Sequence, residues 1–302
     1  MFLKHRSHFL VGGFLVCVLC LLLFTYLPPT YRHRPQRLSS DVESQPGNLE
    51  SRMLHALADR PGCPECTSAS HVREQRNTLS KMLNDLKRQL GQLECDKAKL
   101  QNKKDVSSSG GWCKEESDPK ESKAHMFDQK MADSLGQFLS GQRVGSFGDG
   151  PGKYKEYLLQ QGLVASYDAY DGAPFCENVT SGAVKFMDLT LPQFGLPVYD
   201  WIVSLEVAEH VPARFEVVLV DNIARHARKG IVLSWAHPGQ GGFHHVNNKS
   251  PEDVKRLLDE AGFHSQDNDS LSLKKSSTFS WFRENIFVFR RKSDASLIED
   301  DA

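Results

Sequence analysis

Three glycines at alternate positions follow a short apolar run in the C-terminal half of the chain. The run Val144–Phe147 leads into Gly148-Asp-Gly150-Pro-Gly152, and residues 153–161 continue with helical character. Glycine lets the backbone come close to a ligand, and a helix N-terminus adds N–H donors. We therefore expect a ligand-binding loop lined by these three glycines, with a simple Gly/Pro turn as the alternative.

Acidic residues follow the next two apolar runs. The run Leu163–Tyr170 ends beside Asp171, which lies 19 residues after the last glycine of the loop. A carboxylate near this distance can accept hydrogen bonds from the two hydroxyls of a ribose, so we expect Asp171 to bind a nucleoside-containing cofactor. Asp168 is the competing candidate, because a predicted strand can end a few residues earlier. Asp188 follows the run Val184–Met187 and could reach the exocyclic amine of an adenine.

More polar residues crowd the end of the fourth apolar run and the glycine-rich segment after the fifth. Glu206, Glu209 and His210 follow the fourth run, and the later segment contains His244 and His245. Glycines suit a loop that closes over a substrate, and His245 or His244 could take a proton from an oxygen or nitrogen nucleophile. Structural or surface roles are the alternative for these histidines.

Four side chains near this edge are of types that bind metals, namely Glu209, His210, His237 and His245. Imidazole and carboxylate groups suit several divalent ions. No short ligand motif fixes the geometry of these four residues, so we expect no metal site there. Cys63 and Cys66 have the spacing of a zinc-binding pair, but no second pair follows at zinc-finger distance.

Apolar runs of strand length alternate with helical segments between residues 120 and 292. The predicted strands are Val144–Phe147, Leu163–Tyr170, Val184–Met187, Trp201–Leu205, Ile231–Trp235 and Ile286–Phe289. The predicted helices between them are Lys153–Gln161, Arg214–His226 and Pro251–Ala261. This alternation predicts an α/β domain with a doubly wound, mostly parallel sheet. The carboxyl ends of its strands would bring the glycine loop, the acids and the histidines to one edge.

The order of these elements and motifs resembles that of class I S-adenosylmethionine-dependent methyltransferases of the methyltransferase-like group. The resemblance covers about residues 130–291, and its most specific part is Leu205-Glu206-Val-Ala-Glu209-His210 after the fourth strand. It implies a Rossmann-like methyltransferase fold with a seven-stranded sheet, and S-adenosylmethionine as the cofactor. The acceptor of the methyl group is not implied.

The resemblance also implies roles for individual residues. The cofactor-binding residues would be Gly148, Gly150 and Gly152 at the methionine moiety, Asp171 at the ribose, Asp188 at the adenine, and Glu206 beside them. The catalytic residues would be Glu209, His210 and His245. One position departs from the pattern, because many members have an acid two residues before the first glycine, where this chain has Ser146.

The N-terminal part of the chain predicts a membrane anchor. Residues 9–27 carry no charge and are just long enough to cross a hydrocarbon layer of about 30 Å. A cleaved signal peptide is the alternative, although no small-x-small cleavage site follows. Basic residues flank the span on both sides, so the positive-inside rule is nearly balanced. The short tail 1–8 favours the cytosol, which predicts a single-pass type II protein of the Golgi or endoplasmic reticulum with a luminal domain.

A stem and a long helix are expected between the span and the domain. Residues 28–70 are rich in Pro, Arg, Ser and Gly, as in a flexible spacer. Residues 71–104 carry an apolar stripe at alternating spacings of four and three, which consists of Val72, Leu79, Leu83, Leu86, Leu90, Leu93 and Leu100. The stripe predicts a weak parallel coiled coil and hence a homodimer, with a single helix packed on the domain as the alternative. The turn formers of residues 105–111 predict the boundary of the domain, and residues 293–302 form an acidic tail.

Cysteine usage and charge limit the partners. Five of the seven cysteines lie beyond the apolar span, namely Cys63, Cys66, Cys95, Cys113 and Cys176. An odd number indicates an intermolecular bridge or a free thiol in an oxidising compartment, and Cys95 could lock a dimer. Stem cysteines that bridge a dimer and a loop disulfide are both open. With 37 basic and 38 acidic residues, the chain has no global field that would attract nucleic acid.

Two other functions remain open from the sequence. A luminal glycosyltransferase would share the plan of short tail, anchor, stem and catalytic domain, but Asp168-Ala-Tyr-Asp171 is not a tight Asp-x-Asp pair. A catalytically silent scaffold would use the coiled coil for assembly and a degenerate domain for binding, and Ser146 is the feature that favours it. We expect methyl transfer because the glycine loop fits it better.

Overall fold

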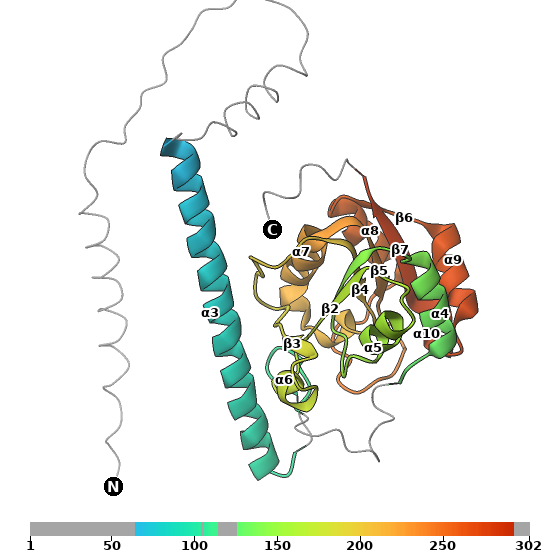
Figure 1. Ribbon diagram of the computed structural model, residues 1–302. Helices are drawn as coiled ribbons and strands as arrows, with labels where there is room; N and C mark the ends of the chain where they lie inside the picture. The colour runs from blue at the N-terminus through green and yellow to red at the C-terminus, as the bar shows by residue number, and fades with distance from the viewer. Residues whose placement is uncertain (1–63, 104–105, 114–125, 293–302) are drawn as a thin grey trace, which may run out of the picture. The chain divides into compact units, whose positions relative to one another are not determined.

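The computed structural model describes residues 64–103, 106–113 and 126–292 (Figure 1). The predicted tail 1–8, anchor 9–27, most of the stem 28–70 and the acidic tail 293–302 lie outside these ranges. Among the described residues, no helix combines the length and the apolar character that crossing a membrane requires. The predicted anchor is therefore untested by the structure.

A seven-stranded sheet with the order β3-β2-β1-β4-β5-β7-β6 forms the centre of the domain. Its strands are β1 (Arg143–Phe147), β2 (Ser166–Asp171), β3 (Val184–Phe186), β4 (Tyr199–Ser204), β5 (Ala227–Ser234), β6 (Phe263–Ser265) and β7 (Ile286–Arg291). The first five are parallel, whereas β7 runs antiparallel to both β5 and β6. The order reverses at β1 and β4, which is the switch point where ligands bind in such sheets. The predicted α/β fold is confirmed.

Helices cover both faces of the sheet (Figure 1). They are α4 (Gln129–Phe138), α5 (Lys153–Gln160), α6 (Cys176–Val179), α7 (Glu216–His226), α8 (Pro251–Glu260), α9 (Asp267–Ser276) and α10 (Ser280–Asn285), with short 3-10 turns η2 (Ala208–His210) and η3 (Ala213–Phe215). Strand β7 shows why both faces are buried. Its Phe287 and Phe289 pack in the core on the α7 and α8 side, while Ile286 and Val288 pack in the core under α4, α5, α9 and α10.

Several boundaries differ from the sequence predictions. Strand β2 begins at Ser166, because Gly162 adopts a left-handed conformation (φ 63°) and extends the turn before it. Strand β5 begins at Ala227, where the Arg291 guanidinium binds the Ala227 carbonyl. Strand β6 was not predicted, because Phe263 is its only buried residue and gives no apolar run.

Helix α3 (Pro64–Leu100) packs on the domain through a polar face. The Asn84 side chain donates from Nδ2 to the Phe186 carbonyl (3.0 Å) and accepts at Oδ1 from the Asp188 amide (2.9 Å). Further along, Ser80 and Gln92 bond the backbone of the domain. Strand β3 is the edge of the sheet, so the Asn84 amide pairs with backbone groups that an edge strand otherwise leaves exposed.

The apolar stripe of α3 faces the solvent. Its seven members, from Val72 to Leu100, are between 46% and 87% exposed. The structure thus corresponds to the alternative of a single helix packed on the domain, although the helix uses its polar side for this contact. The predicted coiled coil finds no support in the structure, and the stripe, called the leucine stripe below, is left uncovered.

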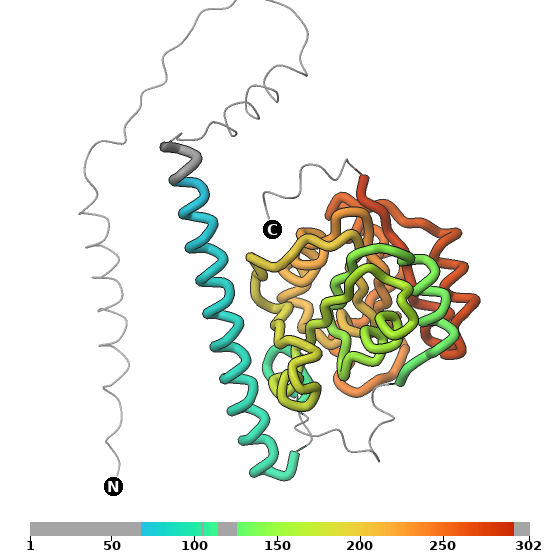
Figure 2. Tube along the Cα trace, in the orientation of Figure 1, coloured from blue at the N-terminus to red at the C-terminus, as the bar shows by residue number. Residues whose placement is uncertain are grey.

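A disulfide joins Cys95 on α3 to Cys113, so Cys95 does not lock a dimer as predicted. The predicted domain boundary also needs correction, because the segment 106–113 packs against the domain (Figure 2). A Cβ on Gly110 would lie 2.3 Å from the His210 carbonyl oxygen, and one on Gly111 would lie 1.9 Å from that of Gly172. The turn formers predict a domain boundary, but here glycine is needed for close backbone contact.

Candidate functional site

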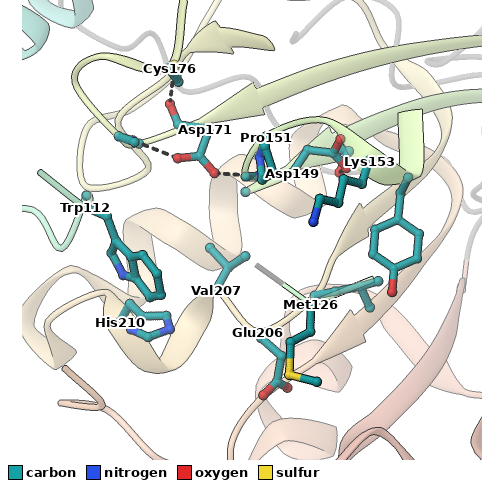
Figure 3. A pocket seen from close by; sticks show the side chains of 18 of the residues that line it. Trp112, Met126, Asp149, Pro151, Lys153, Asp171, Cys176, Glu206, Val207 and His210 are labelled. Atoms are coloured by element: carbon teal, nitrogen blue, oxygen red, sulfur yellow. Dashed lines mark hydrogen bonds between the residues drawn. The ribbon is translucent and has the colours of Figure 1, made fainter. Parts of the chain in front are cut away.

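A cleft of about 1270 Å³ lies at the carboxyl ends of β1, β2 and β4 (Figure 3). All six predicted cofactor-binding residues line it: Gly148, Gly150, Gly152, Asp171, Asp188 and Glu206. Of the predicted catalytic residues, His210 and His245 also line it, while Glu209 lies fully buried beside them. The volume suffices for a drug-sized ligand together with a second small molecule.

The three glycines of the loop adopt backbone conformations that favour glycine. Gly148, Gly150 and Gly152 all have positive φ, at 93°, 59° and 83°. A Cβ on Gly148 would lie 2.2 Å from Cγ2 of Val207, so this position excludes every other residue. Gly152 is the N-cap of α5, and the first turn of that helix opens at the cleft. Backbone N–H groups at this point can bind a ligand.

Asp171 connects the glycine loop to the end of β2 (Figure 3). Its Oδ2 accepts from the Gly150 amide and its Oδ1 from the Ala173 amide, both at 2.8 Å. Each carboxylate oxygen has a further lone pair, so Asp171 can still accept hydroxyl donors. The competing residue Asp168 instead accepts from the Tyr199 hydroxyl (3.0 Å) and does not line the cleft. Of the two aspartates, Asp171 is therefore the one placed to contact a ligand in the cleft.

Asp149, between the first two glycines, is a site residue that sequence reasoning missed. Its Oδ1 accepts from the Ser146 hydroxyl (2.6 Å) and from the Tyr167 hydroxyl (3.0 Å). Its Oδ2 is buried without a hydrogen-bond partner at the wall of the cleft. Burial raises the pKa of this carboxyl to about 6, although both hydroxyls oppose the shift. Asp149 thus places an acid three residues after Ser146 at the wall of the cleft, and its place beside a glycine was the available signal.

Asp188 lines the cleft, but its carboxylate already has partners within the protein. Its Oδ1 accepts from the amide (2.8 Å) and the hydroxyl (2.6 Å) of Thr190. Its Oδ2 has no hydrogen-bond partner and lies 3.7 Å from Nζ of Lys87 on α3. The ammonium group of Lys87 is a charge partner that the sequence did not reveal, because the two residues are about 100 positions apart.

Glu206 adopts a left-handed backbone conformation (φ 55°) at the end of β4. Non-glycine residues rarely do so, and such strain is concentrated at functional sites. Its carboxylate accepts at Oε1 from Ser234 (2.9 Å) and Asn285 (2.7 Å), and at Oε2 from Gln240 (3.1 Å). Three neutral donors therefore hold Glu206 at the floor of the cleft.

Glu209, His210 and His245 come together although 35 residues separate the two histidines. One ligand-type atom from each lies within 4.8 Å of the others. Glu209 is fully buried, and neither of its oxygens has a hydrogen-bond partner. Burial and the nearby Glu206 carboxylate raise the pKa of Glu209 well above its usual range.

The other two histidines of the loop are placed elsewhere. His237 bonds Glu284 through Nε2 (2.9 Å) at the outer rim. His244 has a left-handed backbone (φ 59°) and contributes its carbonyl oxygen, not its ring, to His210. The ring of His245 packs on Gly242, where a Cβ would lie 2.0 Å from Nε2. Of His244 and His245, His245 is therefore the residue whose side chain is placed to contact a ligand in the cleft.

Trp112 forms a further wall of the site that the sequence did not predict (Figure 3). Its ring makes edge contacts with His210 (5.9 Å between ring centroids) and with Phe243 (5.7 Å). The segment that carries it is tied to α3 by the disulfide at the adjacent Cys113 and by a hydrogen bond from the Ser108 amide to Glu94 (2.7 Å). A residue outside the predicted domain thus lines its cleft.

Comparisons with known proteins give only distant similarities. No protein-family model and no curated protein matches the chain. Among solved structures, the magnesium protoporphyrin IX methyltransferase of Synechocystis PCC 6803 with bound S-adenosylhomocysteine is 20% identical, with 54% of this chain and 83% of that chain covered and a TM-score of 0.41. The sugar N-methyltransferase KedS8 of Streptoalloteichus sp ATCC 53650 is 14% identical, with 55% and 88% covered and a TM-score of 0.43.

Not every similar structure is named as a methyltransferase. The [4+2]-cyclase SpnF is 10% identical, with 54% of this chain and 80% of that chain covered and a TM-score of 0.39. A shared fold at these identities does not fix an activity. The function of this chain must therefore be argued from its own site.

Proposed function

We propose that this chain binds S-adenosylmethionine in the cleft and transfers its methyl group to a polar acceptor. The observation that carries the proposal is the combination, on one cleft wall, of the glycine loop, Asp171 and the unpartnered Oδ2 of Asp149. A cofactor with an ammonium group and a ribose offers a partner for each carboxylate. The strand order, with the cleft at its switch point, agrees with this assignment.

The residues present fit the parts of this cofactor. Oδ2 of Asp149 would accept from the ammonium group of the methionine moiety, which removes the cost of an unpaired buried oxygen. The free lone pairs of Asp171 would accept from the ribose hydroxyls, and Asp188 would face the adenine amine. Glycines 148, 150 and 152 leave the backbone open to close approach.

Methyl transfer asks little of the protein besides alignment. An acceptor oxygen or nitrogen forms a bond to the methyl carbon, the carbon–sulfur bond breaks, and its electron pair stays on sulfur as S-adenosylhomocysteine leaves. An acceptor that carries a proton must lose it, and the imidazole of His245, which lines the cleft, is the candidate to receive it. Trp112 and His210 would confine the acceptor beside the cofactor.

We also propose that the enzyme is a single-pass type II membrane protein of the Golgi or endoplasmic reticulum with its domain in the lumen. The Cys95–Cys113 disulfide supports this placement, because disulfides persist in oxidising compartments. The exposed leucine stripe with its heptad spacing supports a homodimer through α3. The separate positions of Asp168 and Asp171 give no support to a glycosyltransferase, whose metal would need them together.

The direct test is calorimetric titration of the full-length protein in detergent with S-adenosylmethionine and S-adenosylhomocysteine. We expect micromolar binding and a loss of at least tenfold in Asp171→Ala, because ribose hydroxyls and the Gly150 amide lose their acceptor. Asp168→Ala is the matched control, since that residue lies off the cleft. No binding by the folded wild type would favour a silent scaffold.

A further inference from the structure

The buried carboxylate of Glu209 has no partner within the part of the chain that the structure describes. Glu209 is 0% exposed, and neither Oε1 nor Oε2 has a hydrogen bond. Burying a carboxylate without a partner is among the most costly arrangements in a protein, and such groups are normally paired or bound to a metal. The neighbouring Glu206 adds a second negative charge, and the nearest donors are the backbone amides of Glu209 and Ala236. The site is therefore built for a positively charged ligand.

The two histidines beside Glu209 are held in fixed orientations. Nδ1 of His210 lies 3.2 Å from the His244 carbonyl oxygen. In the tautomer in which Nδ1 donates to that oxygen, Nε2 carries the lone pair that can bind a metal. The amides of Val246 and Asn247 both donate to the Glu209 carbonyl, at 2.9 and 3.0 Å, and this clamps the loop with His245 onto η2.

We propose that Glu209, His210 and His245 bind a divalent transition-metal ion. Their ligand atoms lie within 4.8 Å of one another, and small side-chain rotations would bring them to the separation of about 3.4 Å that bonds of about 2.1 Å require. Two imidazoles and one carboxylate suit Zn²⁺, Mn²⁺, Fe²⁺ or Co²⁺ better than Mg²⁺ or Ca²⁺, which prefer all-oxygen sites.

The position of the site indicates what the ion would do. His210 and His245 line the cleft, so coordination positions that the protein leaves open face the space for a small molecule. An ion there would bind an acceptor through oxygen and lower the pKa of its hydroxyl group. This use rests on the proposed methyl transfer, in which the ion would replace His245 as the group that stabilises the deprotonated acceptor. Metal binding itself does not rest on it.

The test measures metal binding without any cofactor. Full-length protein is stripped with a chelator and titrated with Zn²⁺, Mn²⁺, Co²⁺ and Mg²⁺ by calorimetry, while Co²⁺ binding is also followed by its visible absorption. We expect one ion per chain with micromolar or tighter affinity for Zn²⁺ and Co²⁺, and at least hundredfold weaker binding of Mg²⁺. Because S-adenosylmethionine is absent, failure of this test leaves the proposed methyl transfer untouched, and the reverse also holds.

Variants assign the ion to the three residues. Glu209→Gln keeps the shape but removes the charge, and His245→Ala removes one ligand from the less buried side, so one of the two should fold. Each should weaken Zn²⁺ binding at least hundredfold and abolish the Co²⁺ absorption. His237→Ala is the control, because its ring bonds Glu284 at the rim and should leave the affinity unchanged. Wild-type protein that binds no ion, or variants that bind as the wild type does, would overturn the proposal.

Discussion

Asp171 and Glu209, two carboxylates at the same cleft, are satisfied in opposite ways. In the cofactor half, Asp171 accepts two backbone amides at 2.8 Å and remains able to accept hydroxyls. In the acceptor half, Glu209 is fully buried, and neither of its side-chain oxygens has a hydrogen-bond partner among the residues that the structure describes. A carboxylate with amide partners is ready for a neutral, hydroxyl-bearing ligand, whereas one without partners is ready for a cation. The difference separates a nucleoside site from a charge site within one cleft.

The largest loss of cofactor binding is expected when a methyl group is added to the glycine loop. Gly148→Ala should abolish detectable binding of S-adenosylmethionine, because its Cβ would lie 2.2 Å from Val207 and the backbone has a φ of 93°. Gly141→Ala is the matched control, since Gly141 also has a positive φ (69°) but nothing lies within 4 Å of its Cβ position. Both variants share the backbone strain. A difference between their cofactor affinities, measured by calorimetric titration, is therefore due to the steric clash between the new Cβ and Val207. Equal losses in the two would contradict the role of the loop.

Removing the disulfide should loosen the wall between the two halves. Cys113→Ser should lower the free energy of unfolding by about 3 kcal/mol, because the 18-residue separation sets the chain entropy that the bridge removes. It should also raise the mobility of Trp112, seen as a red shift and stronger quenching of its fluorescence. Denaturant unfolding measures the first effect. A reductant should lower the free energy of unfolding of the wild type but not that of the variant. A further decrease in the variant would indicate another disulfide.

Neutralising Asp149 should weaken cofactor binding and at the same time raise the stability of the protein at neutral pH. Asp149→Asn should bind S-adenosylmethionine about tenfold more weakly because the cofactor ammonium loses a charged acceptor. The folded-state pKa of about 6 exceeds the ordinary 3.8, so the wild type loses stability as pH rises between these values. The variant should lack this loss and be more stable at pH 7 by about 3 kcal/mol. Titration calorimetry and thermal unfolding across pH 4 to 8 measure both, and parallel pH curves would count against the assignment.

The smallest effect on the site is expected from the leucine stripe. Replacing Leu83, Leu86 and Leu90 by Gln should convert a dimer into a monomer while cofactor affinity stays within twofold, because these side chains are exposed on α3. Analytical ultracentrifugation reads the mass. Asn84→Ala is the contrasting variant on the docked face of the helix, where it should lower stability but keep the dimer. A wild type that is monomeric at all concentrations would end the dimer proposal.

The sequence predicted the elements that carry a periodic signal and missed those that depend on distant contacts. Strand β7 begins with a continuous apolar run, Ile286–Phe289, and the glycines of the loop are visible as a motif. Asp149 was overlooked because its role depends on the hydroxyls of Ser146 and Tyr167, which meet it only in the folded sheet. Glu209 and His245 were expected at the same sheet edge, but the two backbone bonds to the Glu209 carbonyl that hold them together cannot be read from the sequence.

The contact that helix α3 makes with the domain was also hard to predict from the sequence, for a similar reason. A leucine repeat on α3 suggested that the apolar side would make the contact, yet Ser80, Asn84 and Gln92 do so. Polar side chains that bond a strand edge leave no periodic pattern. Glycines 110 and 111 looked like a linker because close backbone packing and flexibility use the same residue.

The pairing of Asn84 with β3 sets where this protein can be cut. Asn84 of helix α3 pairs with backbone groups at the edge strand β3, so an expression fragment that starts after Cys113 would expose these groups and lose Trp112 from the cleft. Exposed edges recruit other chains, and such a fragment would aggregate or bind its ligands with an incomplete wall. Helix α3 and the domain should therefore be kept together in any fragment that is expressed.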